Sequence, residues 1–260
     1  MLLLKKQKYN LTEDGFSILG KVFSKKETKS AYTGLSEVIM GKYNTGKNPE
    51  RRFWNVGDDP NAIIKIDKPH LSNRSVWNLI TNRKFGEALA SITNSRKIQV
   101  WHTQVVWKPK SKLSSGNAGW HRDAQYWPFW SKQGLYTAWV ALSNVSIRSG
   151  PVQFIIGSNH WDSLSGLDFF NQDLESQNKI LKKHNHQKKT ISAILKEGQV
   201  SVHSSLTYHS SSANKEENPR VGMVVHFCTE KAKQIAIKGE NKNYLNQLKN
   251  PGICPVIYGK

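Results

Sequence analysis

The pattern of apolar and polar positions changes its period near residue 97. Before that point apolar residues recur at helical spacing, and the first such stretch follows Ser24 and Glu27, which match a helix-capping box. This spacing predicts a helix from about residue 25, and similar stripes predict helices over residues 75–82 and 84–93.

After residue 97 the pattern becomes alternating, which is typical of strands. A turn at Asp14 and Gly15 precedes another short strand, residues 63–66 predict one more, and the polar stretch 42–62 is expected to be loop. Helices followed by many strands predict a β-barrel or a double sheet with helices packed against one face. The main predicted strands are 98–107, 136–142, 152–156, 199–203, 206–211 and 220–227.

Length and composition predict one globular domain over residues 1–260. We divide it into a helical support (about 11–95), a strand-rich core (about 97–230) and a charged, partly helical insertion (about 161–190). Hydrophobic residues make up 37% and aromatic residues 10% of the chain, which argues against disorder. No apolar run approaches membrane-spanning length, and the leucines after Met1 are too short for a signal-peptide core.

Charge and cysteine content add two expectations. The formal net charge of +19 favours either an anionic partner or a generally lysine-rich surface, and the scattered lysines favour the surface. His184 and His186, between lysine pairs, are expected in a solvated loop rather than a metal site. Two cysteines do not form a disulfide framework, so we expect a reducing, cytoplasmic setting.

The candidate chemistry begins with His121 and Asp123. Strand side chains repeat every two residues, so these two would lie on one side of an extended strand. His209 can complete a face of two histidines and one carboxylate, which leaves coordination positions open and suits Fe(II) enzymes that activate dioxygen. His203 shares the parity of His209, but we expect it beside the site or in the core. His102 and His226 lack partner spacing, and His70 is expected in a loop.

An arginine and an aromatic run accompany these residues. Arg220 lies eleven positions after His209, and a hairpin would return it beside His209 and Ser211. Its planar guanidinium matches a carboxylate with two parallel hydrogen bonds, although a loop-anchoring ion pair is the alternative. Tyr126, Trp127, Phe129 and Trp130 are expected either to line a pocket or to pack in the core.

These residues also carry a family resemblance, because several short motifs occur in the order and at the separations found in the phytanoyl-CoA dioxygenase family. The resemblance spans about residues 11–230 and implies a double-stranded β-helix (jelly-roll) core with the helices supporting one sheet. The motifs are Asp14-Gly15-Phe16, Lys108-Pro109, Trp120-His121-Arg122-Asp123, Ser149-Gly150-Pro151, Ile156-Gly157-Ser158-Asn159-His160, and His209 followed by Ser211, Asn214 and Arg220.

The resemblance implies a site as well as a fold. It implies Fe(II) held by His121, Asp123 and His209, with dioxygen as oxidant and ascorbate as a stimulant. Halogenating relatives lack the metal carboxylate, so Asp123 favours hydroxylation or another oxidation. The implied contacts to the co-substrate 2-oxoglutarate are Arg220, Ser211, Trp139, Gln104 and Lys65, and the expected substrate contacts are Tyr126, Trp127 and Trp130.

The expected reaction oxidises a C–H bond of a small, possibly anionic, organic metabolite and releases succinate and CO2. Two other classes remain as alternatives at this point. A basic nucleic-acid-binding protein would explain the charge and the aromatic residues. It would leave the spacing of His121, Asp123, His209 and Arg220 as a coincidence. A jelly-roll metal sensor or lyase would use the same ligands without 2-oxoglutarate.

Overall fold

The computed structural model describes residues 9–111, 113–183, 189–235 and 241–259. The N-terminal leucines and the two histidines of the lysine-rich stretch, His184 and His186, lie outside these residues. None of the helices in the described residues is long and apolar enough to cross a membrane.

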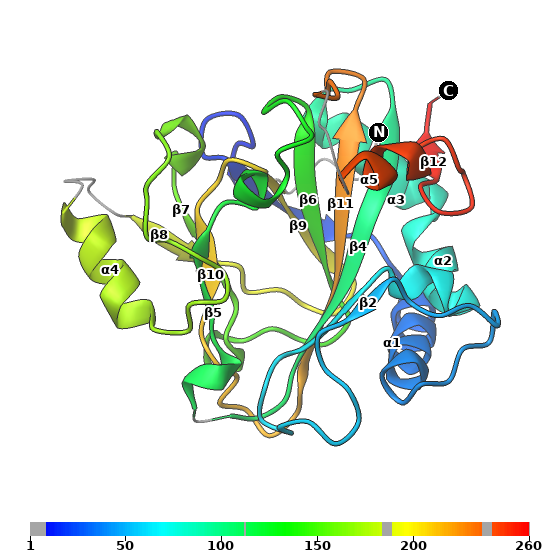
Figure 1. Ribbon diagram of the computed structural model, residues 1–260, viewed down its shortest axis with the longest axis horizontal. Coiled ribbons are helices and arrows are strands. Elements are labelled where there is room, and N and C mark those ends of the chain that lie inside the picture. Colours follow the sequence, from blue (N-terminus) through cyan, green and yellow to red (C-terminus); the bar gives the residue numbers. More distant parts are fainter. Residues whose placement is uncertain (1–8, 112, 184–188, 236–240, 260) are drawn as a thin grey trace.

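Two antiparallel sheets face each other and form the body of the molecule (Figure 1), which agrees with the double-sheet prediction. The major sheet contains, in spatial order, β1 (Phe16–Lys21), β9 (Gln199–Ser204), β6 (Leu135–Ala141), β11 (Arg220–Thr229), β4 (Ile98–Lys108), β3 (Ile64–Asp67) and β2 (Arg51–Arg52), with β12 (Val256–Tyr258) also paired to β4. The minor sheet contains β5 (Ala118–His121), β10 (His209–Ser211), β7 (Val152–Ile155) and β8 (Thr190–Ser192).

Three helices, α1 (Lys25–Ile39), α2 (Arg74–Ile80) and α3 (Arg83–Thr93), cover the outer face of the major sheet (Figure 1). The predicted capping box begins α1, since Ser24 Oγ accepts from the Glu27 amide and the Glu27 carboxylate accepts from the Ser24 amide. Apolar side chains of these helices pack on the outward-facing residues of the sheet to make the largest core. This core fixes the major sheet on one side and leaves its other side free to line a cavity.

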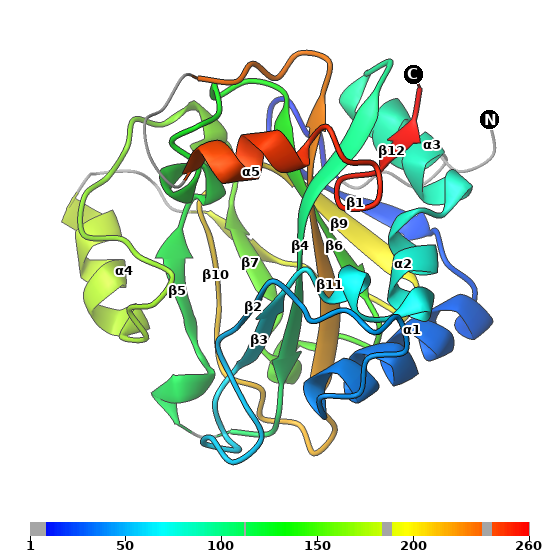
Figure 2. The ribbon, with the colours of Figure 1, turned by 45° about the vertical axis from the view of Figure 1, so that its right-hand side comes forward.

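Two helices lie elsewhere. The insertion forms α4 (Leu174–Lys183) beside the minor sheet, and α5 (Asn241–Gln247) crosses in front of the strands near one end of the sheets (Figure 2). Short 3-10 helices complete the chain: η1 (Pro69–Leu71), η2 (Ser114–Gly116), η3 (Asp123–Tyr126), η4 (Ile147–Ser149) and η5 (Ser158–His160).

Two predicted boundaries differ in the structure. The expected loop 42–62 contains the two-residue strand β2. The strand expected over 206–211 begins only at His209, because a turn between Ser204 and Thr207 precedes it. The strands expected after Asp14-Gly15 and over 63–66 are present as β1 and β3.

Candidate metal and co-substrate site

A cavity of about 340 Å³ lies between the two sheets. Residues from distant parts of the chain reach it because each lies on the inward face of its strand or on a loop at the sheet ends. The predicted site residues that line it are Lys65, Gln104, His121, Asp123, Tyr126, Trp127, Trp139, His209, Ser211 and Arg220.

The two candidate histidine ligands sit on neighbouring strands of the minor sheet. His121 of β5 and His209 of β10 are direct cross-strand partners, and their ring centroids are 4.1 Å apart. The Nδ1 atom of His121 lies 2.7 Å from the Gly119 carbonyl, and that of His209 lies 3.0 Å from the Thr207 carbonyl. These contacts place the ring protons on Nδ1, so both Nε2 atoms keep a free lone pair. Burial lowers the pKa of both imidazoles, which keeps them neutral.

Asp123 completes the cluster from just beyond the end of β5. The sequence placed it on the same strand as His121, but the strand ends at His121 and Asp123 begins η3. Arg122 between them remains extended (φ −114°, ψ 135°), so the two-residue parity still brings the carboxylate to the imidazoles. Its Oδ1 atom lies 3.8 Å from Nε2 of each histidine, and one ligand atom from each of the three residues lies within 4.8 Å of the others.

The second carboxylate oxygen of Asp123 is held by the major sheet. Oδ2 lies 3.1 Å from His203 Nε2 and accepts a 2.5 Å bond from Thr137 Oγ1, whose oxygen lies 2.8 Å from His226 Nδ1. Burial by itself raises the pKa of Asp123, but the hydrogen bond that its carboxylate accepts from His203 opposes this effect, and the pKa lies well below its usual value. The carboxylate is therefore ionised, and its Oδ1 atom is turned toward the two Nε2 atoms.

The three supporting residues form one row across the major sheet. Register pairs His226 of β11 with Thr137 of β6, and Thr137 with His203 of β9. The same row continues to His102 of β4, which pairs with His226 and stacks on it at 5.5 Å. Two neutral imidazoles and one oriented carboxylate, with space on the cavity side, fit a divalent iron that keeps open positions.

Arg220, the first residue of β11, is a buried cation at the other end of the cavity. Its side chain is 1% exposed, and its Nε and Nη1 atoms have no hydrogen-bond partner among the described residues. Burial lowers the pKa of Arg220 to about 9, which leaves it charged at neutral pH. A buried guanidinium with two free donors is unfavourable unless an anion binds it. The geometry therefore fits the carboxylate of a bound acid.

Two features shape this end of the cavity. The guanidinium lies over the Trp139 ring, 4.9 Å from the ring centre, and Trp139 lies against Gly222, where a Cβ atom would come within 2.0 Å of Trp139 Cζ2. The buried Lys108 donates to Ser211 Oγ and to the Ser212 carbonyl, each at 2.7 Å. Ser211 Oγ thus accepts from Lys108, and its own proton remains available for a ligand in the cavity.

The sequence profile of the phytanoyl-CoA dioxygenase (PhyH) family matches residues 11–222. The chain belongs to this family. A curated relative, the peroxisomal phytanoyl-CoA dioxygenase of Homo sapiens, is 23% identical over 154 residues, which cover 58% of this chain and 45% of the relative. The match thus spans less than half of that relative's length.

Solved structures share the fold of this PhyH-family chain. SnoK, a non-heme alpha-ketoglutarate-dependent carbocyclase from nogalamycin biosynthesis, superposes with a TM-score of 0.72 at 18% identity, covering 95% of this chain and 93% of its own. The epimerase SnoN, solved with Fe3+, alpha ketoglutarate and nogalamycin RO, gives 0.65 at 20% identity, covering 87% of this chain and 84% of its own. EctD from S. alaskensis, solved with 2-oxoglutarate and 5-hydroxyectoine, gives 0.60 at 16% identity, covering 84% and 73%. The jelly-roll core is thereby confirmed.

The other residues predicted to contact the co-substrate or the substrate occupy different surroundings in this PhyH-family fold. The Lys65 ammonium lies over phenylalanine rings, 4.2 Å from the centre of Phe53 and 5.1 Å from that of Phe169. Tyr126 and Trp127 line the cavity, Tyr126 at its more exposed side. Trp130 is not among the lining residues; it packs against Trp101 and Phe129, which do line the cavity.

Several functional candidates were missed by motif reasoning. His102 and His226, set aside for lack of partner spacing, both line the cavity, as do Asp67 and Thr137. His70, expected in a loop, is buried and lies 2.7 Å from Thr103 Oγ1 through Nδ1. The register between neighbouring strands decides which side chains lie next to one another across the sheet. The periodic pattern within a single strand carries no information about that register. Parity did identify His203, which contacts Asp123 as expected of a residue beside the site.

Proposed function

We propose that this chain is an Fe(II)- and 2-oxoglutarate-dependent oxygenase that oxidises a C–H bond of a small organic molecule. The observation that carries the proposal is the pairing of two features in one cavity. A cluster of His121, Asp123 and His209 stands at one side, and at one end stands the guanidinium of Arg220, whose Nε and Nη1 atoms have no hydrogen-bond partner among the described residues. A metal sensor or a lyase gives no reason for a buried arginine with two such donor atoms facing the same cavity as the metal cluster.

In this proposal the residues of the cavity have three roles, of which the first is to hold the metal. His121, Asp123 and His209 hold the iron, while His203 and Thr137 fix the orientation of the Asp123 carboxylate. Bound iron, with 2-oxoglutarate and dioxygen, supplies the oxidising chemistry and releases succinate and CO2.

The second task is to hold 2-oxoglutarate. Arg220 would hold its distal carboxylate through charge-assisted hydrogen bonds, Ser211 would offer its hydroxyl, and Trp139 and Gln104 line the same cavity. The third task is to exclude water around the substrate, and Tyr126 and Trp127 contribute to it. The neighbours SnoN and EctD, both solved with this acid, support the assignment.

Calorimetry of the purified protein with Mn(II) and 2-oxoglutarate tests the proposal without turnover. We expect 2-oxoglutarate to bind only when Mn(II) is present and Arg220 is intact. Metal binding without any 2-oxoglutarate binding would favour the sensor or lyase. A metabolite screen for substrate-stimulated succinate release under Fe(II), ascorbate and oxygen then identifies the substrate.

The setting of the reaction is also part of the proposal. Cys228 and Cys254 are both buried and unpaired. Burial raises the pKa of the Cys254 thiol to about 11, which keeps it protonated and unreactive at neutral pH. We infer a reducing compartment such as the cytoplasm, and localisation of a tagged chain in its native cell checks this.

A further inference from the structure

Lys108, the last residue of β4, is a second buried basic residue beside Arg220. The two are direct cross-strand partners in the register of β4 and β11, so both side chains leave the sheet on the same face. Lys108 is fully buried and Arg220 is 1% exposed. In the described part of the chain neither side chain forms an ion pair with a carboxylate. Two like charges opposite each other in a buried site are unfavourable, so one of the two groups is under pressure to lose its proton.

The Nζ atom of Lys108 faces three oxygen atoms at the end of β10. It lies 2.7 Å from Ser211 Oγ, 2.7 Å from the Ser212 carbonyl oxygen and 3.2 Å from the Ser211 carbonyl oxygen. Carbonyl oxygens only accept, so these two contacts use two N–H donors of Lys108. The contact with Ser211 Oγ works in either direction, because a hydroxyl both donates and accepts.

The protonation state of Lys108 decides that direction. An ammonium has a third N–H, which it donates to Ser211 Oγ, and the hydroxyl proton of Ser211 is then free for a ligand in the cavity. A neutral amine has two N–H donors and a lone pair, so Ser211 donates its own proton to Nζ. In that state the hydroxyl has no proton to offer to a bound acid.

The surroundings of Lys108 favour the neutral amine while no acid is bound. Burial, and after it the charge of the cross-strand arginine, lowers the pKa of Lys108 well below its usual value. The loop after β10 carries two carboxylates, but both have other partners, since Glu216 accepts from Ser146 and Glu217 pairs with Lys110. Among the described residues no acid therefore offsets the burial of Lys108.

We propose that Lys108 takes up a proton from solvent when 2-oxoglutarate binds, and that this protonation frees the Ser211 hydroxyl to donate to the co-substrate. The inference rests on the proposed function and assigns a regulation to the same site. A carboxylate held by Arg220 brings negative charge beside Lys108, which favours the ammonium over the amine. The proton adds to the lone pair of Nζ, and the hydrogen bond from Ser211 to Nζ reverses. Lys108 is thus a positioning residue, which acts on the co-substrate through Ser211.

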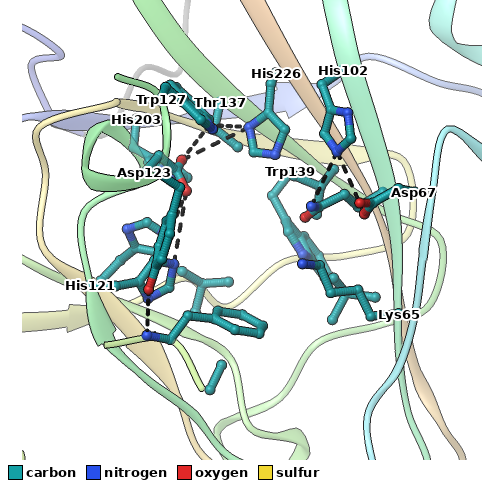
Figure 3. Close-up of a pocket in the computed structure, with 18 of the residues that line it drawn as sticks. Lys65, Asp67, His102, His121, Asp123, Trp127, Thr137, Trp139, His203 and His226 are labelled. Carbon is teal, nitrogen blue, oxygen red and sulfur yellow. Dashed lines mark hydrogen bonds and ion pairs between the residues drawn. The ribbon is translucent and has the colours of Figure 1, made fainter. Parts of the chain in front are cut away.

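Lys65 is the other lysine whose charge responds to an acid in the cavity. It lies across the cavity from His121 (Figure 3). Burial lowers the pKa of Lys65, but Asp67 opposes this effect. Arg220, with a pKa lowered by burial to about 9, keeps its charge at neutral pH. Lys108 has no acid such as Asp67 beside it, so it is the group that is neutral before the co-substrate binds.

Proton uptake on binding makes the affinity for 2-oxoglutarate depend on pH. Below the pKa of Lys108 in the acid-free protein the lysine is already charged, and the affinity is constant. Above that pKa the affinity falls as the pH rises, by up to about tenfold per pH unit, until the pKa of the bound state is reached.

Calorimetry of the whole protein loaded with Mn(II) tests the proposal. Titration with 2-oxoglutarate in buffers that differ in their heat of ionisation measures the protons taken up on binding. Between about pH 7 and 8.5, below the pKa of Arg220, we expect an uptake that approaches about one proton per bound 2-oxoglutarate, with an affinity that falls as the pH rises. Binding without net proton uptake in the unaltered protein overturns the inference.

Three variants assign the proton to one lysine. Lys108→Met should bind 2-oxoglutarate about tenfold more weakly at about pH 7, and should lose both the proton uptake and the pH dependence. Lys65→Met should keep the proton uptake, whatever happens to its affinity. Lys110→Met is the control, because this exposed lysine lies two residues beyond Lys108 and makes only a surface ion pair with Glu217. Its affinity and its proton uptake should be unchanged.

The outcomes separate this inference from the proposed function. Proton uptake that persists in Lys108→Met, or that disappears in Lys65→Met, overturns the role of Lys108 and leaves the oxygenase standing. If Lys108→Met does not fold, the unaltered protein and Lys65→Met decide, since uptake in both supports the inference and its absence in either overturns it. Failure of the unaltered, Mn(II)-loaded protein to bind 2-oxoglutarate overturns the proposed function itself.

Discussion

The two sheets that enclose the cavity differ in length and in support. The central strands β4 and β11 of the major sheet are 11 and 10 residues long, and every residue of β11 is buried. In the minor sheet β5 and β10 have 4 and 3 residues and are backed by the smaller apolar cluster around Trp120 and Leu181. The well-supported sheet carries Arg220 and Trp139, and the short sheet carries His121 and His209.

This difference indicates how each half of the site is held. The apolar contacts of a long sheet with a helical backing can offset the unfavourable burial of a guanidinium that makes no ion pair among the described residues. The short sheet instead fixes its imidazoles by their Nδ1 bonds to backbone carbonyls. A metal that joins these imidazoles to Asp123 would therefore stabilise the weaker sheet most directly.

Asp123 joins the two sheets, so its removal should have the largest effect. In Asp123→Ala the third ligand is lost together with the acceptor for Thr137 and His203. We expect succinate formation to fall by at least ~100-fold, more than the loss of a supporting contact produces. Succinate assay under Fe(II) checks the loss, and circular dichroism checks the fold. Asp162→Ala, at an exposed carboxylate, is the control, and retained turnover in Asp123→Ala would contradict the metal assignment.

Arg220 tests the major sheet. Arg220→Met should weaken 2-oxoglutarate binding roughly 100-fold, because a bidentate, charge-assisted contact is lost. The metal-free variant should be as stable as the unaltered protein or up to about 4 kcal/mol more stable, since an unpaired buried charge is removed. Calorimetry with Mn(II) and urea unfolding measure the two effects.

Arg52 is a matched control with the opposite expectation. Its guanidinium donates to the Val38 and Ile39 carbonyls at the end of α1. Arg52→Met should therefore lower stability and leave 2-oxoglutarate binding unchanged. Equal behaviour of the two variants would mean that Arg220 is a structural residue and that the sheets do not divide the site as described.

Metal addition tests the minor sheet. Without metal, we expect the amides of β5 and β10 to exchange with solvent faster than those of β4 and β11, because the short strands open locally. Mn(II) at a free concentration of 100 times its dissociation constant should slow exchange in β5 and β10 about 100-fold. Hydrogen exchange followed by mass spectrometry measures both. Equal amide exchange rates in the two sheets of the metal-free protein would contradict the view that the minor sheet is the less stable of the two.

The sequence predicted the parts of this site that local patterns encode. The period change near residue 97 marked the point where helices α1 to α3 give way to the long strands. The two-residue spacing of His121 and Asp123 still brought their side chains together, although strand β5 ends at His121. The roles of Thr137 and His226 were not predictable, because they depend on the register of strands far apart in the chain. Trp130 was misplaced for a related reason, since aromatic character does not tell a cavity wall from a core. Nothing in the sequence indicated that Tyr244 of α5 would line the cavity.

The smallest predicted effect concerns Thr137, which lies in the row of paired residues across the major sheet between His203 and His226. Thr137→Val removes the hydroxyl that bonds Asp123 Oδ2 and contacts His226, but it keeps the shape of the side chain. We expect Mn(II) affinity to fall about tenfold, the lower end of the range for a contact that orients a metal ligand. Thr137→Ser should restore the affinity because it restores the hydroxyl. Thr229→Val, at a buried threonine at the far end of β11, should leave Mn(II) affinity unchanged. If Thr137→Val binds Mn(II) normally in calorimetry, the major sheet only packs against Asp123, and the short sheet positions the metal ligands alone.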